Sequence, residues 1–94
     1  MKTVTLYVDK DIKNLTGYPL GKRLYNEQVS KIYVIGEELC IKFPDNIEKV
    51  GISFVQGFFS EIKPLIGYEG IITTITIDTI HPKLREQIFN KITV

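Results

Sequence analysis

The sequence predicts an α/β fold, with helices packed on a single small mixed sheet. Short runs of alternating or β-branched residues recur along the chain, and stretches whose apolar residues repeat with helical period separate them. The chain has 94 residues, of which 44 % are hydrophobic, and this supplies one core but not two. We therefore expect one domain over residues 1–94, with the element order β-α-β-β-α-β-α.

Charge and cysteine content narrow the classes of function. The 12 Lys and Arg residues face 11 Asp and Glu residues, so the net charge of +1 offers no general attraction to nucleic acid. No run of the sequence approaches the roughly 18 apolar residues that a membrane span requires. The single cysteine, Cys40, excludes an internal disulfide and fits a reducing compartment. We expect a cytoplasmic protein that binds neither nucleic acid nor a membrane.

The N-terminal part of the chain predicts a strand and a helix. Residues 3–8 alternate between apolar and half-polar positions, which is typical of a strand with one buried face. A mostly polar connection over residues 9–16 follows. Pro19 suits the first turn of a helix that opens at Gly17 and is expected to end near residues 28–29.

Two further β-branched or aromatic runs, residues 31–35 and 39–43, flank a Gly-containing turn and predict a β-hairpin. The alternative is that the first helix continues through Val34. Tyr, Val and Ile are mediocre helix formers, so the hairpin is favoured. In the second strand Cys40 and Lys42 share one face, and the apolar residues share the other.

The middle of the chain carries the clearest helix signal. Ser53 and Gln56, three residues apart and ahead of an apolar run, match a capping box. Gly57 inside this helix costs about 1 kcal/mol relative to Ala, a cost that close approach to a strand beneath would justify. Pro64 and Gly67 are expected to end the helix. Its apolar stripe comprises Phe54, Val55, Phe58, Phe59, Ile62, Leu65 and Ile66.

The C-terminal part predicts one strand and one helix. Residues 71–77 are β-branched throughout, which indicates a long central strand. A turn through His81 and Pro82 leads into the last helix. Right-handed crossovers would make the last two strands parallel neighbours or near neighbours. The buried stripe of the last helix is Leu84, Ile88 and Ile92, with Phe89 beside it.

The strand at residues 39–43 and the stretch Ile52-Ser53-Phe54-Val55-Gln56-Gly57-Phe58-Phe59 together resemble a known family. This family is the STAS-like domains of unknown function, distant relatives of the anti-sigma-factor antagonists. Its members run from a strand through a short acidic turn to a serine-rich turn that ends in Ser-Phe and opens a helix. The later strand and helix follow at the family's spacing, so the resemblance spans residues 17–92.

The resemblance implies a mixed sheet with helices and a role as a regulatory switch. The better-known relatives bind an ATPase-type kinase that phosphorylates a serine at the start of the corresponding helix, which adds about −1.5 to −2 charges to the partner-facing surface. The antagonists carry Asp-Ser-Ser-Gly at that turn, where this sequence reads Gly51-Ile52-Ser53-Phe54. The phosphorylated position therefore falls at Ile52 or, one residue later, at Ser53.

The expected contact surface is the turn before this helix together with the first helical turn. Ser53 is the candidate phosphoacceptor, although a helix cap alone accounts for a serine there. It is not expected to act as a catalytic nucleophile, because activation needs a base and His81 is the only histidine. The partner-binding residues that we predict are Asn46, Gly51, Ile52, Ser53, Phe54, Gln56 and Gly57.

No catalytic, cofactor or metal site is expected. One His and one Cys cannot supply the four ligands of a structural zinc site without carboxylates. The acidic pairs at residues 9 and 11 and at residues 37–38 lie in turns, where solvated carboxylates are common. Neither standard Gly-rich phosphate loop is present, and the pair Lys22-Arg23 offers a small anion contact only.

Three functions remain as hypotheses. The favoured one is a non-catalytic bacterial regulatory module that binds a protein partner, with a histidine-kinase-like ATPase as the candidate. The second is a small inhibitor or accessory protein, phage- or mobile-element-encoded, that binds an unrelated protein through another surface. The third is a small enzyme or ligand-binding domain, which would require a deep pocket lined by carboxylates with perturbed pKa values.

Overall fold

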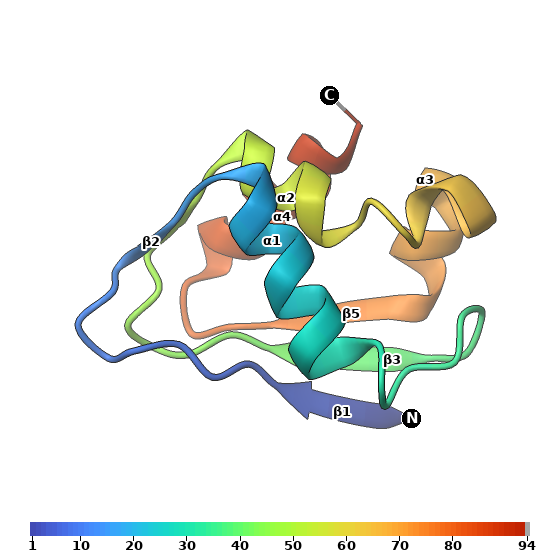
Figure 1. Ribbon diagram of the computed structural model, residues 1–94, viewed down its shortest axis with the longest axis horizontal. Coiled ribbons are helices and arrows are strands. Elements are labelled where there is room, and N and C mark those ends of the chain that lie inside the picture. The colour runs from blue at the N-terminus through green and yellow to red at the C-terminus, as the bar shows by residue number, and fades with distance from the viewer. Residues whose placement is uncertain (94) are drawn as a thin grey trace.

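The computed structural model describes residues 1–93, in which helices cover one side of a small sheet (Figure 1). The strands are β1 (Lys2–Thr5), β2 (Asn14–Leu15), β3 (Leu39–Lys42), β4 (Lys49–Val50) and β5 (Ile75–Asp78). The helical elements are α1 (Tyr18–Leu24), the π-helical turn η1 (Tyr25–Val29), α2 (Ile52–Phe58), α3 (Lys63–Thr74) and α4 (Pro82–Ile92). The α/β class is confirmed, but the chain holds more elements than the seven expected.

The main sheet is parallel rather than mixed. Its strands lie in the order β1-β3-β5, and both neighbouring pairs run in the same direction. The expectation that the strands at residues 39–43 and 71–77 would be parallel neighbours is therefore confirmed for β3 and β5. The helices α1, α2, α3 and α4 lie on one side of these strands (Figure 1). The strand residues buried beneath them are Val4, Leu39, Ile41, Ile75 and Ile77.

The first strand is shorter than the predicted residues 3–8, yet its alternation continues beyond its last ladder position. The Leu6 amide still donates to the Lys42 carbonyl at 2.9 Å, and the Leu6 side chain is buried. At Tyr7 a side chain takes the place of a neighbouring strand. The Tyr7 amide donates to Gln28 Oε1 at 2.7 Å, and Gln28 Nε2 donates to the Tyr7 carbonyl at 2.9 Å.

A second, two-stranded parallel ladder lies within segments expected to be connections. β2 pairs with β4, with Leu15 opposite Val50. Both of these side chains are buried, and the Gly51 amide extends the pairing by donating to the Leu15 carbonyl at 2.8 Å. Two-residue strands are too short to leave a periodic pattern, so neither strand could be predicted from the sequence.

The first helix begins and ends as predicted. Pro19 lies in its first turn, and η1 continues α1 as far as Val29. The Ser30 amide donates to the Tyr25 carbonyl at 2.9 Å, five residues back, which is the hydrogen-bond spacing of a π-helical turn.

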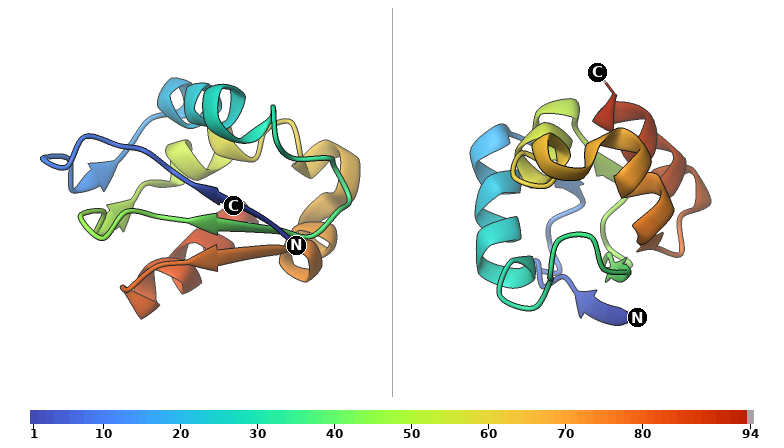
Figure 2. Two further views of the ribbon diagram at one scale, coloured as in Figure 1. Left: turned by 90° about the horizontal axis from the view of Figure 1, so that it is seen from below. Right: turned by 90° about the vertical axis from the view of Figure 1, so that its right-hand side faces the viewer.

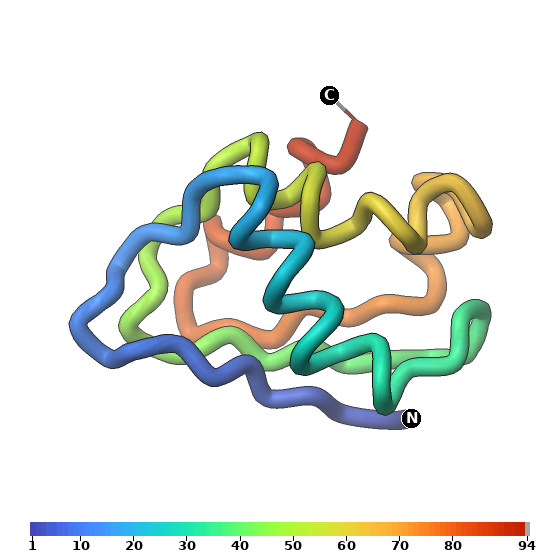
Figure 3. Tube along the Cα trace, in the orientation of Figure 1, coloured from blue at the N-terminus to red at the C-terminus, as the bar shows by residue number. Residues whose placement is uncertain are grey.

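The predicted hairpin of residues 31–35 and 39–43 is wrong. Residues 30–38 form a loop at the far end of the molecule from β2 (Figure 3), and the alternative helix through Val34 is also absent. Within the loop the Glu37 amide donates to the Val34 carbonyl at 3.0 Å, which closes a turn. The two edges of β3 are occupied by β1 and β5, so an antiparallel strand has no position beside it.

The predicted strand at residues 71–77 is half wrong, because α3 continues to Thr74 before β5 begins. The threonine hydroxyls bond back into the helix: Thr73 Oγ1 donates to the Glu69 carbonyl at 2.8 Å, and Thr74 Oγ1 donates to the Gly70 carbonyl at 2.6 Å. Ile71 is buried in the core from this helical position. The weak helix propensity of Ile and Thr costs at most about 0.7 kcal/mol per residue, less than burial of one isoleucine contributes.

The predicted helix from Ser53 to residues 64–67 is divided in two. α2 ends at Phe58, and α3 begins at Lys63, so Pro64 lies in the first turn of a helix instead of ending one. Gly67, with a φ of 71°, interrupts α3. Leu65, expected in the buried stripe, is 67 % exposed because the new helix turns it outward.

The C-terminal helix matches its prediction. α4 buries Leu84, Ile88 and Ile92, and Phe89 packs beside them at partial exposure. These side chains join one hydrophobic cluster with the sheet and with α2. Within residues 1–93, no helix is long and apolar enough to cross a membrane.

Candidate functional site

Two glycines let α1 and α2 cross in backbone contact. A Cβ atom at Gly57 would overlap the Tyr18 carbonyl oxygen, and a Cβ atom at Gly21 would overlap the Phe54 carbonyl oxygen. Gly57 was expected to approach a strand, and that expectation is wrong, because its close neighbour is a helix. The crossing places the Tyr18 ring, 43 % exposed, beside the outer face of α2.

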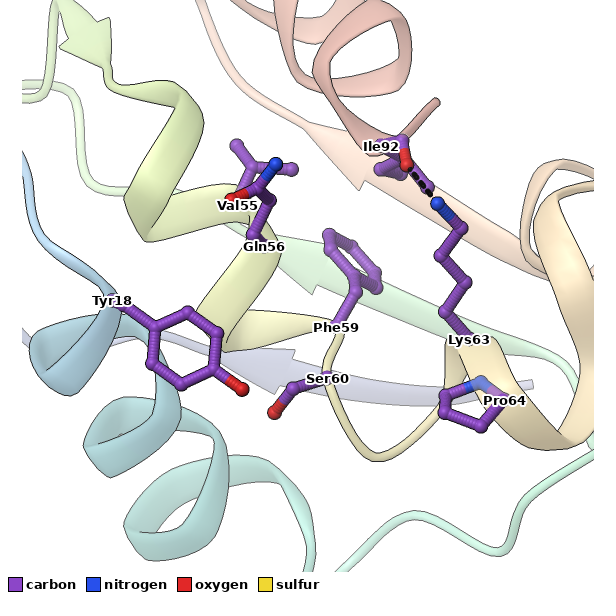
Figure 4. A pocket seen from close by; sticks show the side chains of 8 residues that line it. All are labelled: Tyr18, Val55, Gln56, Phe59, Ser60, Lys63, Pro64 and Ile92. Atoms are coloured by element: carbon purple, nitrogen blue, oxygen red, sulfur yellow. Dashed lines mark hydrogen bonds between the residues drawn. The ribbon is translucent and has the colours of Figure 1, made fainter. Parts of the chain in front are cut away.

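A pocket of about 530 Å³ opens where this crossing meets the ends of α3 and α4 (Figure 4). Its lining comes from α1, α2, the linker after α2, α3 and α4, so residues far apart in sequence meet here. The buried side chains among them, Val55, Phe59 and Ile92, make its wall largely apolar. The full lining is Tyr18, Val55, Gln56, Phe59, Ser60, Lys63, Pro64 and Ile92.

Two polar side chains of the pocket, Lys63 and Ser60, are held in place by backbone carbonyls. Lys63 Nζ donates to the Ile92 carbonyl at 2.6 Å, so its cation lies at the C-terminal end of α4, where the helix dipole favours positive charge. Ser60 Oγ donates to the Gly57 carbonyl at 2.8 Å. Among the described residues that line the pocket there is no carboxylate and no histidine. The arrangement suits an apolar group with a polar or anionic end.

The capping box predicted at Ser53 is absent. The N-cap of α2 is Gly51, which has extended backbone dihedrals and makes no side-chain cap hydrogen bond. Ser53 lies in the first turn of α2, at its second position, and is exposed to solvent. Gln56 lies on the same outer side and also lines the pocket. Ile52, one helical turn before Gln56, is 43 % exposed.

The predicted partner-binding residues in and next to α2 therefore differ in their exposure to solvent. Ile52, Ser53 and Gln56 share the exposed side of α2, while Phe54 and Gly57 are buried in the core and in the helix crossing. Gly51 is half-buried at the start of the helix.

Asn46 has a structural role in its loop. Its Nδ2 donates to the Ile12 carbonyl at 2.6 Å and to the Asp9 carbonyl at 3.2 Å, and so joins two loops at one end of the sheet. A partner that contacted this amide would have to compete with both bonds.

The other residues singled out from the sequence have local roles. His81 is the N-cap residue of α4, and its Nε2 lies 2.8 Å from the Asp45 carbonyl oxygen. The Asp11 amide donates to Asp9 Oδ1 at 3.0 Å, which forms a turn. Over residues 1–93, no group of three His, Cys, Asp or Glu side chains is arranged to hold a metal ion.

Sequence reasoning found Gln56 but missed most of the pocket. The lining residues come from α1, α2, α3, α4 and the linker after α2, and α1 reaches α2 where Gly21 lies against the Phe54 backbone and Gly57 against the Tyr18 backbone. One local signal was available: Pro directly after Lys63 is typical of a helix start, and such a start would have brought a new helix end to this place.

Comparison of the chain with protein-family models, with curated proteins and with solved structures gives no match. The STAS-like resemblance thus stays a prediction that depends on the residues quoted above.

Proposed function

We propose that the chain is a regulatory protein-binding module, similar in role to the anti-sigma-factor antagonists, and that it binds its partner through the outer side of α2 and the adjoining pocket. The observation that carries the proposal is the open pocket with apolar walls beside Gln56. Exposed apolar surface bordered by polar groups is typical of protein-binding sites.

The exposed side chains around the pocket support this proposal. Tyr18 and Ile52 are each 43 % exposed, and Leu65, next to the pocket residue Pro64, is 67 % exposed. Burial of such side chains against a partner would contribute roughly 25 cal/mol per Å² of apolar surface. The lone Cys40 thiol fits a cytoplasmic setting for this interaction.

The candidate partner is a histidine-kinase-like ATPase, and Ser53 is the candidate phosphoacceptor. Ser53 is exposed at the second position of α2, so a kinase can reach its hydroxyl. A phosphate there would add about −1.5 to −2 charges to the contact surface and change its complementarity to the partner.

Co-expression and pull-down with such an ATPase test the proposal. Ser53→Asp should weaken the complex at least tenfold, whereas Ser30→Asp, at an exposed serine that follows η1, should leave it unchanged. Equal affinity of both variants would remove the α2 surface from the interface.

Crosslinking of a captured complex separates this proposal from its rival. Crosslinks at α2 and the pocket support the regulatory module. Crosslinks confined to another surface support the small inhibitor or accessory protein that binds an unrelated target.

A further inference from the structure

The side of the main sheet that faces away from the helices is uncovered. In the view from below, the three strands run side by side with the helices on their other side (Figure 2). Alternation places two residues of each strand on this surface, which we call the outer sheet face. Its members are Thr3 and Thr5 of β1, Cys40 and Lys42 of β3, and Thr76 and Asp78 of β5.

An uncovered parallel sheet is an unusual arrangement. All-parallel sheets occur almost only where both faces are covered, because their crossover connections place helices on both sides. Here Cys40 at the centre of the face is half-buried, and the other five members are exposed. The main sheet therefore carries helices on one side only, whereas parallel sheets normally carry helices on both sides.

The chemistry of the outer sheet face indicates what fits it. Four of its members are small and uncharged, and the other two carry opposite charges. Lys42 and Asp78 are register partners on neighbouring strands. The ion pairs within residues 1–93 are Lys2–Glu37 and Arg23–Glu27, so neither charge of the face is used within the chain. Because a positive and a negative side chain lie next to each other on this face, the same face of a second molecule can pair with both charges.

We infer that the outer sheet face binds a second copy of this chain. A two-fold axis parallel to the strands and midway between β3 and β5 would place β3 of each copy over β5 of the other. Lys42 of each copy would then face Asp78 of the other, which gives two equivalent ion pairs, as a two-fold interface requires. Face-to-face sheets lie about 10 Å apart, a gap that an extended lysine and an aspartate bridge.

The dimer is expected to be weak and sensitive to salt. The sheet has three strands of four residues each. The area that its outer face can bury is therefore well below the roughly 800 Å² per partner of a standard interface. Its two ion pairs lie near solvent, where added salt screens them. The face lies across the sheet from α2, so the inference is independent of the proposed partner site.

Sedimentation velocity with charge-reversal variants tests this geometry. The wild-type chain should show a dimer fraction that rises with concentration. Lys42→Glu alone and Asp78→Lys alone each place like charges opposite one another twice, and each should weaken the dimer at least tenfold. An equimolar mixture of the two variants restores both ion pairs in the mixed dimer, so it should recover wild-type association.

A crosslinking measurement fixes the register. Cys40 of one copy should lie over Thr76 of the other, so a bismaleimide that spans the roughly 10 Å between packed sheets should join a wild-type chain to a Cys40→Ser/Thr76→Cys chain. A Cys40→Ser/Thr3→Cys chain is the control, because β1 lies outside the overlap.

Three results would overturn the inference. They are a wild-type chain that stays monomeric up to about 1 mM, a dimer that neither reversal weakens, and a mixture that fails to recover association. Unchanged unfolding curves of both variants, within about 0.5 kcal/mol, will show that the exposed substitutions leave the fold intact.

Discussion

The two sides of the main sheet differ in packing: side chains are closely packed on the helix side and exposed to solvent on the outer side. On the helix side, α1 and α2 approach so closely that Gly21 and Gly57 have room for no side chain, and the aromatic rings pack in series. Phe58 lies 5.8 Å from Phe54 and 5.1 Å from Phe59 between ring centroids. On the outer side, threonines and two unpaired charges face solvent.

This difference shows where stability and interaction are expected to lie. The helix side holds the hydrophobic core cluster, so substitutions there should change the free energy of unfolding. The outer sheet face contributes little to that cluster, so substitutions there should change association instead. Adjacent residues of one strand, pointing in opposite directions, allow a direct comparison.

The largest expected effect is at Ile77, on the buried side of β5. Ile77 is fully buried, so Ile77→Ala should lower the free energy of unfolding by about 2–5 kcal/mol through lost burial and a cavity. Thr76→Ala, one residue earlier and facing outward, should cost less than about 1 kcal/mol. Urea denaturation followed by circular dichroism measures both, and similar losses would mean that the outer face is covered within the monomer.

A smaller loss is expected at the helix crossing. Helix propensity alone predicts that Gly57→Ala stabilises α2 by about 1 kcal/mol. Because the added Cβ would overlap the Tyr18 carbonyl oxygen, we expect a destabilisation of about 1–3 kcal/mol instead. Ser53→Ala, on the exposed side of the same helix, is the control and should stay within about 0.5 kcal/mol. A stabilised Gly57→Ala chain would show that the helices are further apart.

The smallest effect concerns pH. Burial, with the nearby charge of Glu61, raises the pKa of the Tyr25 phenol above its ordinary value of 10.0. Its contribution to stability is complete below pH 10.0 and is lost as the pH rises through the folded-state pKa, because the unfolded chain releases the proton first. One such group changes the free energy of unfolding by at most about 1.4 kcal/mol per pH unit.

Denaturation between pH 9 and pH 11 measures this contribution. Tyr25→Phe should flatten the loss of stability above pH 10.0 relative to the wild-type chain. An unchanged slope in Tyr25→Phe would show that the phenol stays solvated.

The sequence predicted the faces of the strands better than their partners. Alternation correctly placed Val4 and Ile41 inward and Cys40 on the opposite face, because each side chain's direction follows from its own position. Strand direction does not follow from periodicity. The hairpin at residues 31–35 and 39–43 was therefore wrong, and the parallel pairing of β1 with β3 was not foreseen.

The candidate site was predictable only where one segment supplies it. Ser53 and Gln56 belong to a strong local helix pattern, and both are exposed as a contact surface requires. The rest of the pocket depends on tertiary contacts, such as the bond between Lys63 and the Ile92 carbonyl, which join segments 29 residues apart. No local pattern encodes a meeting of this kind.

The glutamine amide that pairs with Tyr7 has a consequence for the exposed border of β1. Even-numbered residues of this strand bond toward β3, so the Tyr7 amide and carbonyl point to the open border, where Gln28 occupies both. A strand of another molecule that paired with β1 would be blocked by the Gln28 side chain after Thr5. The Gln28 side chain thus shortens the unpaired length of β1 to which a strand of another molecule could add, and such addition is a route to aggregation.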